Sequence, residues 1–132
     1  MSELEETVIG ILRNEGPTHI RRLIKRSGWS GPAINLTVRR LRAVGVILPV
    51  GRVVVQPYAE SLAGFEDTKR AILEWCIVAN QDGRPSTAAE IAAGLGANHW
   101  PVASYCGLLT KLGAFYPAGT VTLSPRWVEA QR

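Results

Sequence analysis

Residues 30–55, SGPAINLTVRRLRAVGVILPVGRVVV, decide the fold. In the first half, Ile34, Val38 and Leu41 fall on one stripe at helical spacing, which predicts a helix with one face against a core. Gly45 ends this helix, because glycine tolerates the positive φ of a helix terminus. The second half places turn-forming residues between two β-branched runs. It predicts two short strands, residues 46–49 and 52–55, joined as a tight β-hairpin.

The composition sets limits on the class of protein. A chain of 132 residues fits one domain or two very small ones. The chain has no apolar run of the roughly 20 residues that a membrane helix needs, so we expect no membrane partner. The N-terminus, MSELEETVIG, is acidic where a signal peptide would be basic, and a cytoplasmic protein is therefore expected.

The chain also matches itself without a gap at an offset of 68 residues. Core positions, helix ends and turn residues all recur in the same order. The matching pairs are Glu6 and Glu74, Ile9 and Ile77, Pro17 and Pro85, Gly28 and Gly96, Leu41 and Leu109, Gly45 and Gly113, Pro49 and Pro117, Gly51 and Gly119, Val53 and Val121, Pro57 and Pro125. Because the glycine and proline residues that end helices and form turns repeat in the same order, we expect two copies of one structural unit.

The first unit is expected to span residues 1–57. Apolar spacing predicts a helix over residues 4–15, and Thr18 is the expected N-cap of a second basic helix that ends at Ser27 and Gly28. Ser30 is the expected N-cap of the third helix. The order is helix, helix, helix, hairpin.

After a short connector at residues 58–66, the second unit is expected to span residues 67–125. Its first helix is expected to begin with Asp67 or Thr68 as cap, and Ser86 should cap a short alanine-rich helix. A third helix over residues 98–112 and a hairpin over residues 114–123 complete the unit. The tail, residues 126–132, is expected to add a short helix containing Trp127.

This arrangement resembles tandem winged-helix (winged helix-turn-helix) proteins, in particular bacterial, archaeal and phage transcription regulators. The resemblance covers nearly the whole chain and implies a mainly α fold with small β-hairpins, of the α+β class. It also implies that the third helix enters the major groove of DNA and that the second helix abuts the phosphates. The resemblance implies contacts to base edges or phosphates from Asn35, Arg39 and Arg40. It implies contacts to the DNA backbone from Arg21, Arg22, Lys25, Arg26, Arg42 and Arg52. In such proteins the hairpin, called the wing, reaches the neighbouring minor groove. Here its turn is so short that only Arg52 is expected to reach DNA from it.

The charge distribution favours the same partner. Residues 1–62 contain nine lysine and arginine residues against five acidic ones, whereas residues 63–132 contain six of each. Most of the excess lies on the second and third helices of the first unit, and a cationic face gains affinity by releasing counterions from phosphates. The alternative is that these arginines form an ordinary solvated face.

The second unit lacks this charge. At the 68-residue offset, Arg39 and Arg40 become Gly107 and Leu108. We expect a protein interface on its third helix, for a homodimer or another partner. Its residues are Trp100, Ser104, Leu108 and Lys111. The alternative is that Trp100 and Leu108 pack against the first unit.

Nothing in the sequence suggests catalysis, a metal site or a cofactor. Cys76 and Cys106 have no metal-ligand spacing and match core positions of the first unit, so they are expected to be buried thiols. No enzyme is expected. Two functions remain open. One is double-stranded DNA binding for transcription regulation, and the other is a tandem winged-helix scaffold or phage-type inhibitor whose basic face docks on an acidic protein or RNA.

Overall fold

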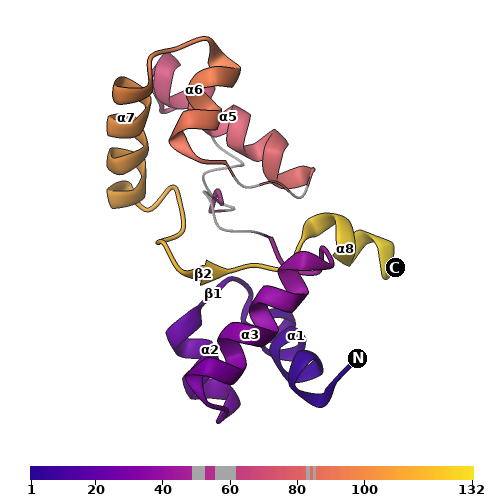
Figure 1. The fold of residues 1–132 in the computed structure, drawn as a ribbon. Helices are drawn as coiled ribbons and strands as arrows, with labels where there is room; N and C mark the ends of the chain where they lie inside the picture. Colours follow the sequence, from indigo (N-terminus) through magenta and orange to yellow (C-terminus); the bar gives the residue numbers. More distant parts are fainter. Residues whose placement is uncertain (49–52, 56–61, 83, 85) are drawn as a thin grey trace. The chain divides into compact units, whose positions relative to one another are not determined.

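The computed structural model describes residues 1–48, 53–55, 62–82, 84 and 86–132 (Figure 1). The chain forms two compact units, one made of Met1–Pro49 and Gly119–Arg132 and the other of Val50–Ala118. The described residues are mainly helical with a small antiparallel sheet, which confirms the α+β class. Within the described part of the chain, no helix has the length and apolar character needed to span a bilayer.

The first unit begins with three helices, α1 (Glu3–Glu15), α2 (Ile20–Ser27) and α3 (Gly31–Ala43). The predicted cap of α3 is confirmed, because the Ser30 hydroxyl accepts a hydrogen bond from the Ala33 amide at 3.3 Å. The predicted cap of α2 is wrong. Thr18 instead donates its hydroxyl to the Gly16 carbonyl, and His19 Nδ1 accepts the Arg21 amide at 3.2 Å.

The three helices enclose one core. Its members are fully or almost fully buried, and those on α1 and α3 recur at helical spacing. They are Val8, Ile9, Leu12, Leu23, Ile34, Val38, Leu41, Val46, Ile47 and Val121. Val121 stands far from the others in the sequence, so the C-terminal segment contributes to the core of the first unit.

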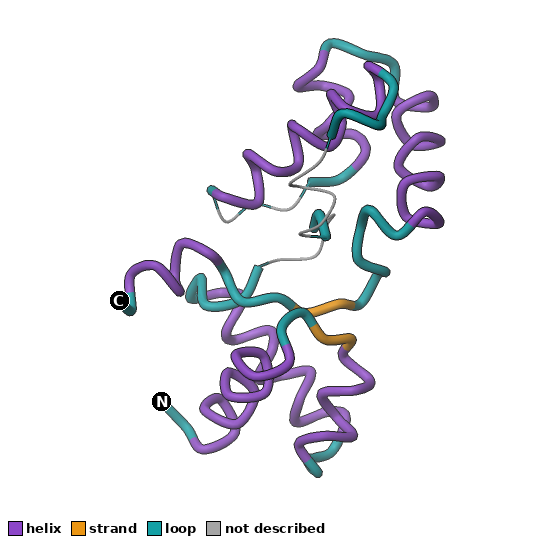
Figure 2. The backbone as a smooth tube through the Cα atoms, turned by 180° about the vertical axis from the view of Figure 1, so that it is seen from behind, coloured by secondary structure: helices purple, strands orange, loops and turns teal. Residues whose placement is uncertain are grey.

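The first predicted hairpin is wrong. β1 (Thr18–His19) pairs antiparallel with β2 (Thr120–Val121), and Ile47 forms a bridge with Leu123. The Leu48 amide donates to the Thr122 carbonyl at 2.9 Å. Residues 120–124 therefore lie between β1 and residues 46–48, in the position where the returning hairpin strand was expected. Figure 2 shows the paired strands in orange.

The C-terminal tail continues from this strand. The predicted tail helix is confirmed as α8 (Pro125–Ala130), whose Trp127 packs against the core of the first unit.

The second unit contains α5 (Asp67–Gln81), α6 (Ala88–Leu95) and α7 (His99–Leu112). The predicted caps shift here as well. Thr87 caps α6, with its hydroxyl accepting the Glu90 amide at 3.2 Å, whereas Ser86 is buried. Glu66 is the N-cap of α5 in place of Asp67 or Thr68.

The predicted hairpin over residues 114–123 is also wrong. Val54 forms a bridge with Phe115, and the Val55 amide donates to the Ala114 carbonyl at 2.9 Å. The Val54 amide donates to Asn80 Oδ1 on α5 at 3.0 Å, which holds the segment against the helix. Residues 114–116 therefore pair with 53–55 in the second unit, while 120–124 pair in the first.

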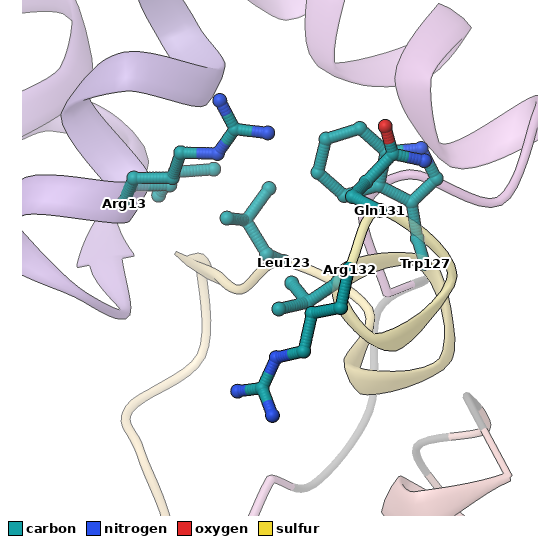
Figure 3. A pocket seen from close by; sticks show the side chains of 7 residues that line it. Arg13, Leu123, Trp127, Gln131 and Arg132 are labelled. Carbon is teal, nitrogen blue, oxygen red and sulfur yellow. The ribbon is translucent and has the colours of Figure 1, made fainter.

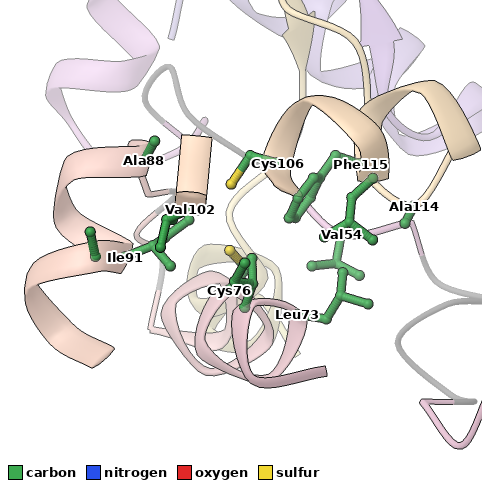
Figure 4. Packing of buried hydrophobic residues seen from close by; sticks show 12 residues of the cluster. Val54, Leu73, Cys76, Ala88, Ile91, Val102, Cys106, Ala114 and Phe115 are labelled. Carbon is green, nitrogen blue, oxygen red and sulfur yellow. The ribbon is translucent and has the colours of Figure 1, made fainter. Parts of the chain in front are cut away.

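The core of the second unit contains both cysteines, as predicted. Cys76 on α5 and Cys106 on α7 are buried cysteines outside any disulfide, and Figure 4 shows their sulfur atoms pointing into the space between the two helices. Gly94 lies against the indole of Trp75, leaving no room for a Cβ. This contact explains a glycine inside α6, because any larger residue would meet the ring.

The repeat is visible in the backbone. α6 starts and ends 68 residues after α2, and α7 starts 68 residues after α3. Gly28 and Gly96, at matching positions after these helices, have φ of 74° and 65°, in the left-handed region. The helix ends and glycines that both copies share therefore serve the fold. Residues that differ between the copies are the better candidates for function.

Candidate nucleic-acid interface

The apolar residues of α3 pack in the core, so the face of α3 toward solvent is mostly polar. Ile34, Val38 and Leu41 are buried. Thr37 is buried too, but its hydroxyl donates to the Ala33 carbonyl at 2.8 Å, so this polar group is satisfied. The face left to solvent carries Asn35, Leu36, Arg39 and Arg40, all exposed. Asparagine and arginine on one helix face can donate to base edges and phosphates.

On α2, four exposed basic residues divide into two stripes of four-residue spacing. One stripe, Arg22 and Arg26, is held by Glu15 at the end of α1. The Arg22 and Arg26 guanidinium groups lie 2.8 and 3.1 Å from the Glu15 carboxylate. Their hydrogen bonds, that of Arg22 first, lower the pKa of Glu15 from its ordinary 4.5, so the carboxylate stays ionised to lower pH than an unpaired glutamate.

The other stripe, Arg21 and Lys25, forms no ion pair within the described residues. The two stripes therefore differ in how much positive charge they offer to a ligand. Arg21 and Lys25 present full charges, whereas Arg22 and Arg26 share the counter-charge of Glu15.

Arg42 and Arg52, both predicted to contact the DNA backbone, differ from the other predicted residues. Arg42 is half-buried, and its Nε is buried and makes no hydrogen bond to the described residues. Burial lowers the pKa of the Arg42 guanidinium from its ordinary value. Arg42 is thus less accessible than Arg39 or Arg40. Arg52 lies outside the described residues.

The structure also adds a residue that sequence reasoning missed. Trp29 stands between α2 and α3, with its amide donating to the Ser27 hydroxyl at 3.2 Å, and 43% of its surface is exposed. An exposed indole beside a basic helix is unusual, because aromatic side chains gain from burial. A tryptophan directly before the Ser30 cap was the available signal.

In the second unit, α7 turns the predicted interface residues to solvent. Trp100 is 81% and Leu108 is 51% exposed, and Ser104 and Lys111 are exposed as well. Leu112, 55% exposed, extends this apolar stripe and was missed. The His99 ring meets the edge of Trp100 at 5.4 Å between centroids.

Among the described residues, no group of three or more histidine, cysteine, aspartate or glutamate side chains could hold a metal ion. Both thiols lie in the core, away from solvent.

Comparison with known proteins gives no assignment: no family model, curated protein or solved structure matches this chain.

Proposed function

We propose that the first unit binds double-stranded DNA as part of a cytoplasmic transcription regulator that has no enzymatic activity. In this proposal α3 enters the major groove, with Asn35, Arg39 and Arg40 toward base edges or phosphates. Arg21 and Lys25 of α2 contact the phosphates, joined by Arg22 and Arg26. Trp29 lies against the sugar-phosphate backbone beside them.

One observation carries this proposal: Arg39 and Arg40 are exposed on the outer face of α3, in a segment without acidic residues. From Ile20 to Ala43 the chain has seven arginine and lysine residues and no aspartate or glutamate. An ordinary solvated helix face mixes both signs, because opposite charges four residues apart stabilise a helix. A surface whose charged residues are all positive is suited to binding a polyanion such as DNA.

The backbone supports the comparison with winged-helix proteins, which remains part of the proposal. Each unit has three helices followed by a short extended segment, which pairs with a strand from the other half of the sequence. In the first unit, the strand at residues 120–124 lies between β1 and residues 46–48. In winged-helix proteins such a sheet packs beside the helix that reads DNA.

For the second unit we propose a protein contact, either a homodimer or another partner, through α7. Trp100, Leu108 and Leu112 form an exposed apolar stripe, in which Leu108 stands at the position that Arg40 has in α3. Exposed aromatic and aliphatic groups are typical of interfaces, whereas phosphate binding needs cations.

The test compares wild type with the double variant Arg39→Ala and Arg40→Ala. Fluorescence anisotropy with a random-sequence duplex at low salt should give a loss of roughly tenfold or more, because about two charge-assisted contacts disappear. Arg84→Ala is the control, since it removes an exposed cation of the second unit that lies outside α7. Its duplex affinity should equal that of wild type.

The same proteins also test the alternative partner. A pull-down with the wild-type protein and the double variant reports whether the basic face docks on an acidic protein or RNA. Wild-type protein that captures such a partner but does not bind duplex DNA at low salt would refute the regulator proposal.

A further inference from the structure

A surface pocket of about 320 Å³ lies between the end of α1 and α8 in the first unit (Figure 3). Leu12 and Leu123 supply aliphatic wall, and the Trp127 indole supplies an aromatic one. Arg13 and Arg132 bring two guanidinium groups. None of these residues belongs to the proposed DNA-binding face.

The pocket combines apolar surface with cations. Arg13 lies over the Trp127 ring, with its guanidinium carbon 5.4 Å from the ring centroid. A cation–π contact of this kind does not use the N–H donors of the guanidinium, which can still form two parallel hydrogen bonds to a carboxylate. Within the described residues, no hydrogen bond uses these N–H groups of Arg13.

Arg132 is only loosely held. Its Nη1 lies 3.7 Å from Glu129, and both side chains are 75% exposed. An ion pair with this exposure contributes little, so a ligand can replace it. Gln131 adds an amide at the same rim.

We propose that this pocket binds a small amphipathic carboxylate with an aromatic or branched aliphatic body. The body would pack on Trp127 and Leu123, and the carboxylate would accept hydrogen bonds from Arg13 and Arg132. The size is adequate, because small-molecule pockets run from about 300 to 1,000 Å³. The proposed site does not depend on DNA binding, and each can fail without the other.

The test uses 2-naphthoate as the probe and 2-naphthamide as its uncharged counterpart. Both are titrated into the full-length protein while the indole N–H resonances of its four tryptophans are followed by NMR. Trp127→Phe identifies the resonance of Trp127. The expected result is a saturable shift of that resonance by naphthoate, with naphthamide binding about tenfold more weakly because it lacks the charged acceptor.

Arg13→Gln and Arg132→Gln should each reduce this preference for the carboxylate. Arg126→Gln is the matched control, because it removes a cation of α8, the helix of Trp127, that does not line the pocket, and it should bind like wild type. The chemical-shift dispersion of each spectrum reports whether the variant is folded. If one arginine variant does not fold, the other still tests the proposal. Equal affinity for the two probes, a shift of other indoles only, or no saturable shift up to millimolar probe would each overturn the proposal.

Discussion

Ile47, just after α3, pairs with Leu123 near the C-terminus, although residues 53–55 are much nearer to it in the sequence. Those residues pair instead with 114–116. Each compact unit is thus completed by a strand from the other half of the sequence. The repeat makes this exchange possible, because Val53 and Val121 occupy equivalent positions and offer similar side chains to either sheet.

Val121→Ala should destabilise the first unit. Val121 is completely buried in the core formed by α1, α2 and α3. Removing two carbon atoms from a packed core costs about 2 kcal/mol of unfolding free energy. Amide hydrogen exchange should therefore accelerate in α1–α3, while the amides of α5–α7 keep their protection.

Val78→Ala is the control, because Val78 is 57% exposed on α5 and should change stability by less than about 0.5 kcal/mol. If residues 114–123 formed a hairpin within the second unit, Val121→Ala would instead weaken protection in α5–α7. That pattern would refute the strand exchange.

The sequence predicted the helices well and the strand partners badly. Helical spacing is local, so Ile34, Val38 and Leu41 suffice to define α3 and its buried face. Strand pairing is not local, and a repeat supplies two nearly equivalent partners for residues 46–48. The N-caps of α2 and α6 lie one residue after the predicted ones. Thr18 and Ser86 are residue types that often cap helices, but here they are buried in extended positions before the helices.

Gly94→Ala should destabilise the second unit. The added Cβ would overlap the six-membered ring of Trp75. Overpacking of this kind costs about 1–3 kcal/mol, which exceeds the gain of up to about 1 kcal/mol from helix propensity. Urea unfolding followed by α-helical circular dichroism measures the change.

Gly107→Ala provides the matched comparison, because Gly107 lies inside α7 and a Cβ there meets nothing within 4 Å. It should stabilise the protein by up to about 1 kcal/mol. A stability gain in Gly94→Ala as large as that in Gly107→Ala would contradict the close contact with Trp75.

Glu15→Gln should strengthen binding to duplex DNA. Glu15 shares its charge between Arg22 and Arg26, so removing the carboxylate charge makes both guanidinium groups more available to phosphates. At low salt the affinity should rise by about two- to tenfold, and anisotropy titration measures it. Glu74→Gln, the same change on exposed surface of α5, should have no effect. Unchanged affinity in Glu15→Gln would mean that Arg22 and Arg26 do not face the DNA.

The basic face was predictable in part. Residue type and helical spacing identified Asn35, Arg39 and Arg40, which the structure leaves exposed. The ion pairs of Arg22 and Arg26 with Glu15 join the ends of different helices, so no spacing rule reveals them. The partial burial of Arg42 depends on packing around the end of α3, which the sequence pattern does not specify.

The salt dependence of duplex binding tests the central claim most directly. Each phosphate contact contributes about −0.9 to the slope of log K against log salt concentration. If Arg39 and Arg40 both face the duplex backbone, their joint replacement by alanine should make the slope shallower by about 2. A wild-type protein that does not bind duplex DNA at low salt, or a double variant with the wild-type slope and affinity, would contradict the account.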